Sequence, residues 1–138
     1  MKLIIAEKRS VAASIASALG AASRADSFYE GNDLLVSWCV GHLVSPMDAA
    51  GYDPRFRKWH FEDLPIQPEP FRYVLASGKE AAFENLRTLM HRPDVDTVIN
   101  ACDAGREGEL IFRLVYELAE CRKPILRLWI SSMEDSAI

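Results

Sequence analysis

The stretch Asp96-Thr97-Val98-Ile99-Asn100-Ala101-Cys102-Asp103-Ala104-Gly105-Arg106-Glu107-Gly108-Glu109 decides how this chain folds. Its first part is an apolar, β-branched run that predicts a buried strand. Residues 110–118, which follow it, repeat apolar positions with the period of a helix. The polar part of the stretch therefore lies on a turn from a strand into a helix. In an open parallel sheet such turns lie at the carboxyl ends of the strands, where ligands bind.

This turn carries carboxylates next to a guanidinium. Asp103, Glu107 and Glu109 are the acids, and Arg106 lies among them. Carboxylates this close together repel one another unless a cation or a proton lies between them. Mg²⁺ binds one or two carboxylates through oxygen and keeps coordination positions open for phosphate. The turn therefore predicts a magnesium site.

A second acidic strand end lies near the start of the chain. Residues 2–6 predict a short buried strand that ends at Glu7. Ser10 is the predicted N-cap of the helix that follows, and Gly20 its stop. One acidic residue after a strand is usually only solvated. Glu7 and Asp103 end two strands, however, and one sheet would bring them to the same edge.

The rest of the chain continues the alternation of strands and helices. Residues 26–40 predict a hairpin around Gly31-Asn32-Asp33, and residues 71–75 and 125–130 predict two more strands. This order of elements predicts an α/β fold. In the helix at residues 110–118, the positions predicted to be buried are Leu110, Ile111, Leu114, Val115 and Leu118.

Two S-x-x-E patterns are typical of helix starts. The first, Ser77 to Glu80, precedes an apolar periodic run that predicts a helix. The second, Ser131 to Glu134, is followed only by the chain end at Ile138. A helix start without its helix predicts that this polypeptide was cut from a longer one.

Residues 46–70 are rich in proline, with aromatic residues between charges. Arg55, Arg57 and Lys58 form a basic cluster beside Trp59. Such a cluster suits single-stranded nucleic acid, whose bases stack on aromatic rings while cations follow the backbone. A loop that packs its aromatic residues onto the sheet is the alternative.

The composition limits the class of protein. The 138 residues are enough for one domain, and 49% hydrophobic with 26% charged residues is a globular composition. The net charge of −4 excludes binding of nucleic acid by bulk positive charge, although a bound metal ion would supply positive charge locally. Three widely spaced cysteines predict free thiols in a reducing cytoplasm. No apolar run is long enough to span a membrane.

Four motifs occur in a fixed order along the chain. They are Ile4-Ile5-Ala6-Glu7-Lys8, Trp38-Cys39-Val40-Gly41-His42-Leu43, Asp103-Ala104-Gly105-Arg106-Glu107-Gly108-Glu109 and Arg127-Leu128-Trp129-Ile130-Ser131. Together they resemble the type IA DNA topoisomerases, and most of all the topoisomerase III branch. The resemblance covers residues 1–138, which would be the N-terminal Toprim domain. It implies a compact, mostly parallel sheet with helices on both faces.

The resemblance also implies a reaction, the Mg²⁺-dependent breakage and rejoining of one DNA strand. A tyrosine of another domain would attack the phosphodiester and become linked to the 5′ phosphate. Glu7 matches the glutamate that protonates the departing 3′ oxygen, and Lys8 matches the lysine that stabilises the scissile phosphate. Asp103 and Glu107 match the metal-binding acids, which Glu7 would join. The residues expected to contact the substrate are Lys8, Arg106 and His42.

Two positions depart from the family pattern. The commoner form of the turn is D-x-D-R-E, and Gly105 replaces its middle acid, which leaves open how many carboxylates hold the metal. Arg9 stands where the family often has proline. For His42 two interpretations remain, a contact to phosphate or a hydrogen bond that holds its own loop.

No tyrosine of this chain matches the nucleophile of the family. The tyrosines are Tyr29, Tyr52, Tyr73 and Tyr116. We therefore expect a catalytic half-site that is inactive alone and needs the remaining domains of the same polypeptide, with a single-stranded segment of DNA as substrate. Alternatives are the Toprim domain of another metal-dependent nuclease or primase, and a non-catalytic module that binds nucleic acid or protein. A Mg²⁺ titration separates the non-catalytic module from the other two.

Overall fold

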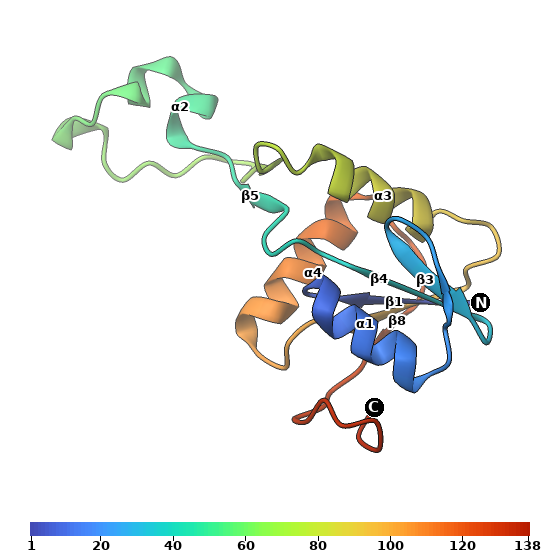
Figure 1. Cartoon of the computed structure of the whole chain (residues 1–138). Coiled ribbons are helices and arrows are strands. Elements are labelled where there is room, and N and C mark those ends of the chain that lie inside the picture. Colours follow the sequence, from blue (N-terminus) through green and yellow to red (C-terminus); the bar gives the residue numbers. More distant parts are fainter.

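A computed structural model describes all residues from Met1 to Ile138 and shows an α/β body with one projecting arm (Figure 1). The main sheet has six strands in the order β2 (Ser23–Arg24), β3 (Phe28–Gly31), β4 (Leu34–Trp38), β1 (Lys2–Ala6), β7 (Thr97–Ala101) and β8 (Ile125–Arg127). The longer helices are α1 (Arg9–Ala18), α3 (Glu80–Met90) and α4 (Arg106–Leu118). The sheet therefore confirms the predicted α/β class.

The centre of the sheet is parallel and one edge is antiparallel. Strand β1 pairs in parallel with β4 on one side and β7 on the other, and β8 continues the parallel part beyond β7. Strands β3 and β4 form the predicted hairpin, but Gly31 belongs to β3, so the connection is only Asn32 and Asp33, at φ 50° and 61°. Two successive residues at positive φ are typical of a type I′ turn, whose twist matches that of the strands.

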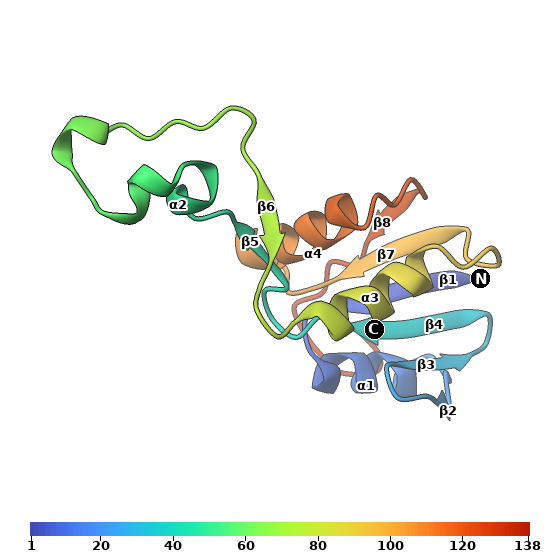
Figure 2. The ribbon, with the colours of Figure 1, turned by 90° about the horizontal axis from the view of Figure 1, so that it is seen from above.

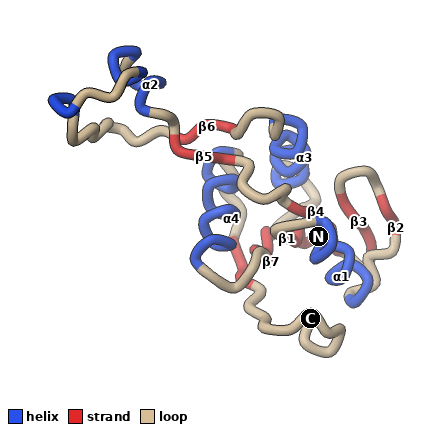
Figure 3. The backbone as a smooth tube through the Cα atoms, turned by 60° about the vertical axis from the view of Figure 1, so that its left-hand side comes forward, coloured by secondary structure: helices blue, strands red, loops and turns tan.

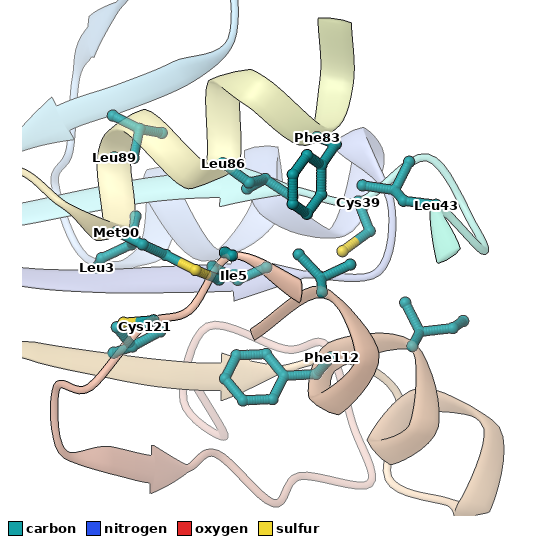
Figure 4. Packing of buried hydrophobic residues seen from close by; sticks show 14 of the residues in the cluster. Leu3, Ile5, Cys39, Leu43, Phe83, Leu86, Leu89, Met90, Phe112 and Cys121 are labelled. Atoms are coloured by element: carbon teal, nitrogen blue, oxygen red, sulfur yellow. The ribbon is translucent and has the colours of Figure 1, made fainter. Parts of the chain in front are cut away.

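Helices cover both faces of the sheet, as the resemblance implied (Figure 3). Alternate residues of β1 supply the two cores: Ile4 packs with α1, whereas Leu3 and Ile5 pack with α3 and α4. Figure 4 shows the second core from close by, with Phe83 and Leu86 of α3 above the strand and Phe112 of α4 below it. Because side chains alternate along a strand, one apolar run such as β1 can serve both cores.

The helix starts differ from the sequence prediction. Helix α1 begins at Arg9 with Lys8 as its N-cap residue, and α3 begins at Glu80 after Lys79. Neither cap residue accepts a hydrogen bond through its side chain. The predictions that Ser10 caps α1 and that Ser77 caps α3 are therefore wrong. Burial of one apolar face is enough to form these helices, since packing supplies most helical stability.

The arm comprises residues 47–72 and extends away from the body (Figures 1 and 2). It contains α2 (Ala49–Tyr52) and two 3₁₀ turns, Pro54–Arg57 and Phe61–Asp63. At its base, β5 (Val44–Pro46) and β6 (Tyr73–Leu75) pair only with each other. The predicted strand at residues 71–75 therefore starts later and lies outside the main sheet.

Aromatic residues of the arm remain in solvent. Trp59 is 85% exposed and Phe61 is 86% exposed. No residue between Ser45 and Ala82 is buried. The alternative in which this loop packs its aromatic residues onto the sheet is therefore wrong. In the basic cluster, Arg55 pairs with Asp53 and Asp63 at 3.6 and 4.0 Å.

The chain ends in turns rather than in a helix. Strand β8 stops at Arg127, three residues before the predicted end at Ile130. The Ser132 hydroxyl accepts a hydrogen bond from the Glu134 amide at 3.2 Å, but no helix follows. None of the helices combines the length and the apolar character needed to cross a membrane.

Candidate metal and phosphate site at the strand ends

Glu7 and Asp103 lie at neighbouring strand ends on one edge of the main sheet. Ala6, the last residue of β1, lies opposite Ala101, the last residue of β7. Glu7 and Cys102 are therefore the next residues on the two strands, and Asp103 follows directly. The register confirms the prediction that two acids far apart in the sequence share this edge.

The residues predicted to contact the substrate surround the same edge. Lys8 is exposed and directly follows Glu7 before α1. The Nε2 atom of His42 lies 3.4 Å from Glu107 Oε2, so the loop after β4 meets the first turn of α4. The Nε atom of Arg106 lies 3.9 Å from Glu107 Oε1, and the Arg106 side chain is 94% exposed. His42 thus contacts a protein carboxylate, and the side chains of Lys8 and Arg106 are open to solvent.

The side chains are not arranged as a metal centre in this structure. No group of three or more His, Cys, Asp or Glu side chains lies close enough together to hold a metal ion. The prediction that Glu7, Asp103 and Glu107 converge within reach of one ion is therefore not met by the side-chain positions. Glu107 turns to His42 instead, and mutual repulsion disfavours bringing carboxylates together without a cation between them.

The donor set nevertheless fits Mg²⁺. Glu7, Asp103 and Glu107 offer only carboxylate oxygens, which suit hard divalent cations. All three are at least partly exposed, so rotation of side chains alone changes their separation. The buried cysteines near this edge belong to the core and offer no open soft-metal site. The donor atoms therefore suit an oxygen-ligated metal ion rather than zinc.

Glu109, the third acid of the turn, is part of a separate network. Its Oε2 accepts a hydrogen bond from Asn100 Nδ2 at 2.8 Å, and its Oε1 accepts one from Arg113 Nε at 2.8 Å. Arg127 Nε lies 3.2 Å from Glu109 Oε2. The Glu109 carboxylate is therefore paired with two guanidinium groups and joins α4 to the last residues of β7 and β8. Glu109 was not among the metal ligands that the resemblance implied, which on this turn are Asp103 and Glu107.

The two glycines of the turn have different reasons to be there. A Cβ at Gly108 would lie 2.2 Å from the carbonyl oxygen of Asp103 and 2.8 Å from its amide nitrogen. Only glycine allows α4 to approach the strand end this closely. Gly105 has an extended backbone, φ −176° and ψ 176°, and nothing lies within 4 Å of a Cβ placed there. Its backbone accepts any residue.

Arg127 is a site residue to which the sequence analysis gave no role. Its Nη1 donates to the carbonyl oxygens of Asn100, Cys102 and Leu128 at 2.9, 2.8 and 2.9 Å. Its Nη2 donates to the carbonyl of Asp103 at 2.8 Å. The only signal was its place in the motif that begins Arg127-Leu128-Trp129. Its contacts depend on how β8 lies beside β7, which no local pattern reveals.

Cys102 lies beneath this edge and is not a nucleophile. It is 2% exposed, and its thiol approaches the carbonyl oxygen of Ile5 at 3.8 Å. A hydrogen bond with Cys39, together with burial, raises the pKa of the Cys102 thiol. A buried thiol with a raised pKa stays protonated at neutral pH and is inert. The prediction of free cysteines is confirmed, since Cys39, Cys102 and Cys121 are all buried and unpaired.

The site defines a class of protein, an α/β domain whose parallel strands end in acidic and cationic side chains suited to a metal ion and phosphate. The chain belongs to the Toprim domain family, because a sequence model of the Toprim domain matches residues 2–133. It is 43% identical over 136 residues to a DNA topoisomerase 3 of Bacillus subtilis (strain 168). It is 40% identical over 137 residues to a DNA topoisomerase 3 of Shouchella clausii (strain KSM-K16). Both alignments cover 99% of this chain and 19% of the relative, so the chain spans about a fifth of their length.

Proposed function

We propose that this chain is the metal-binding catalytic domain of a type IA DNA topoisomerase, which breaks and rejoins a single-stranded segment of DNA through a 5′-phosphotyrosyl intermediate. The observation that carries the proposal is the β1–β7 register, which places Glu7 and Asp103 at one edge of the sheet. The identity to relatives named DNA topoisomerase 3 supports the choice among Toprim activities. Three buried free thiols suit a reducing cytoplasm.

The side chains divide into two roles in this proposal. Glu7, partly exposed at the end of β1, gives a proton to the departing 3′ oxygen and takes it back on rejoining. Lys8, adjacent and exposed, offsets negative charge on the scissile phosphate. Arg106 and His42 contact the flanking DNA backbone, with His42 leaving Glu107 when a phosphate enters. Glu7, Asp103 and Glu107 would hold Mg²⁺, which when bound neutralises charge that develops on the phosphate.

The chain lacks a nucleophile for this reaction at the proposed site. The hydroxyl of Tyr116 donates to the Lys123 carbonyl at 2.7 Å, and that of Tyr52 accepts from the Arg72 amide at 2.6 Å. Tyr29 packs against Trp38 with ring centroids 5.7 Å apart, and Tyr73 lies in β6 at the base of the arm. We therefore propose that the tyrosine comes from another domain and that these residues alone are inactive.

A calorimetric Mg²⁺ titration of the chain tests the metal site. We expect saturable binding that weakens by about 10-fold or more in Asp103→Asn and in Glu107→Gln, because each loses a charged oxygen ligand. Glu84→Gln is the matched control, since Glu84 is an exposed acid on α3 that pairs only with Arg87. Absence of saturable binding in the wild-type chain would refute the metal site. An equal loss of Mg²⁺ affinity in Glu84→Gln would show that Mg²⁺ responds only to the net charge of the chain.

A chimera tests the reaction. In the Bacillus subtilis relative, the 136 matched residues would be replaced by this chain, and covalent adducts with a labelled single-stranded oligonucleotide would be measured on a denaturing gel. We expect an adduct with the chimera and none with the isolated chain. Glu7→Gln in the chimera should lower the cleavage rate by about 100-fold or more, the usual contribution of a general acid, with oligonucleotide binding unchanged. Loss of binding to the same extent would assign Glu7 to folding instead.

A further inference from the structure

The acidic turn lies where the main sheet runs out of backbone partners. The last residues paired between β7 and β8 are Asn100 and Arg127, and the Leu128 amide donates to the Asn100 carbonyl at 2.9 Å. Beyond this point β8 has ended, so the carbonyls of Cys102 and Asp103 have no neighbouring strand, and the only backbone donor to either is the Gly105 amide, 2.8 Å from the Asp103 carbonyl within the turn itself. Polar backbone groups at such a point need other partners to stay fixed.

The side chain of Arg127 supplies the partners that come from outside the turn. Its guanidinium donates to the carbonyls of Cys102 and Asp103, both at 2.8 Å, and also to two carbonyls at the end of the β7–β8 ladder. The side chain is only 21% exposed. One rigid, planar group thus joins the last ladder residues to the first residues of the turn. It acts on the backbone that carries the Asp103 carboxylate and leaves that carboxylate free.

A second set of contacts holds the guanidinium in this orientation. Glu109 Oε2 lies 3.2 Å from Arg127 Nε, as an ion pair without hydrogen-bond alignment, and the guanidinium carbon lies over the Trp129 ring, 5.2 Å from the ring centroid. Glu109 is itself held by Asn100 and Arg113 at 2.8 Å each. Arg127 therefore forms its ion pair with Glu109, and it contacts Asp103 only through the backbone carbonyl.

We propose that Arg127 is a positioning residue, whose fork of hydrogen bonds fixes the backbone of Cys102 and Asp103 so that the Asp103 carboxylate is held ready for the metal. This inference rests on the proposed metal site. A lysine cannot replace Arg127, because an ammonium group is a single point charge and does not present a planar fork of donors.

The test measures Mg²⁺ affinity and turn order separately, with Arg127→Lys, Arg127→Met and the control Arg113→Met. Arg113 pairs with the same Glu109 but donates to no carbonyl of the turn. Urea unfolding first establishes a temperature at which every variant is folded. At that temperature we expect both Arg127 variants to bind Mg²⁺ about 10–100-fold more weakly, which is the usual effect of losing a group that holds a metal ligand in place. Arg113→Met should stay near the wild-type affinity. Without Mg²⁺, NMR should show faster amide exchange at Cys102 and Gly105 in both Arg127 variants, and not in Arg113→Met.

The outcomes separate this inference from the proposed function. Wild-type affinity in both Arg127 variants would overturn the positioning role and leave the metal site standing, as would full rescue by Arg127→Lys. An equal loss in Arg113→Met would also overturn it, since neutralisation of Glu109 would then be the cause. If the wild-type chain shows no saturable Mg²⁺ binding, the proposed metal site fails, and with it the metal half of this inference. The amide exchange then decides whether the fork orders the turn. If Arg127→Met does not fold, Arg127→Lys alone decides by the same criteria.

Discussion

Two glycines on one turn show how a single missing Cβ decides whether the site forms. We expect Gly108→Ala to lower the free energy of unfolding by about 1–3 kcal/mol, the usual cost of overpacking, because its Cβ would meet the Asp103 carbonyl oxygen at 2.2 Å. This is opposite to helix propensity, which favours alanine over glycine inside a helix by about 1 kcal/mol.

Gly105→Ala is the control for that prediction. Its Cβ meets nothing within 4 Å, and the lower preference for Ala than for Gly at this N-cap position opposes the smaller entropy of the unfolded chain, so the free energy of unfolding should change by less than about 1 kcal/mol. Urea unfolding of both variants provides the comparison. Equal effects of the two changes, or a stabilising Gly108→Ala, would show that α4 does not need its close approach to Asp103.

Gly105 is also where this chain departs from the commoner acidic pattern. Its extended φ of −176° and open surroundings leave room for the side chain that the pattern usually carries. We expect Gly105→Asp to tighten Mg²⁺ binding by about 10-fold, within the range for groups that support metal ligands. Gly105 is the N-cap residue of α4, where Asp gains a few tenths of a kcal/mol over Gly.

That gain offsets part of the repulsion from Glu107 and Asp103, so the melting temperature in EDTA should fall only slightly. Calorimetric titration with Mg²⁺ and a thermal melt in EDTA measure the two effects. Unchanged affinity together with a melting temperature lowered by many degrees would show that the backbone needs glycine here.

At the scale of the element, only some of the apolar residues of α4 are buried in the core. Leu110 was predicted to be buried, but it is 41% exposed, whereas Ile111 is 4% exposed. Ile111→Ala should therefore cost about 2–5 kcal/mol of unfolding free energy. Leu110→Ala should cost less than about 1 kcal/mol, since it leaves no cavity. Urea unfolding measures both. Similar costs at the two positions would mean that Leu110 is covered in solution.

Strands and helices were predictable from the sequence because each buries an apolar pattern of its own. The β1 and β7 runs place Glu7 and Asp103 at strand ends, and any parallel pairing brings such ends to one edge. Helix starts failed because the S-x-x-E pattern at Ser77 is a local signal, and the structure begins α3 at Glu80 without using the Ser77 side chain as its cap. The role of Arg127 could not be predicted, because all but one of its carbonyl partners lie on β7 and the turn beyond it, far away in the sequence.

At the scale of the molecule, the chain divides into a body with two cores and an arm without one. The cores draw on β1, β4, β7 and three helices, whereas no residue from Ser45 to Ala82 is buried. Trp59 and Phe61 keep more than four-fifths of their surface in solvent, which is unusual for aromatic side chains of a monomeric domain. The arm therefore contributes its surface, and little of the stability, to this chain.

Removal of the arm tests that division. Pro46 and Tyr73 are a paired position of the β5–β6 ladder, so replacing residues 47–72 with Asn-Gly would close a two-residue hairpin. We expect the shortened chain to fold, with the free energy of unfolding changed by no more than about 2 kcal/mol. Shortening the loop lowers the entropy cost of closing it, by about 0.6 kcal/mol per halving of length. Met47 and Phe71 line a surface pocket together with Leu114 and Leu118, and loss of their apolar surface there acts in the opposite direction. Mg²⁺ affinity should be unchanged, because no arm residue belongs to the strand-end site.

A shortened chain that fails to fold would show that the arm is part of the body's folding unit. Unchanged stability with lost Mg²⁺ binding would show that the arm reaches the site in solution.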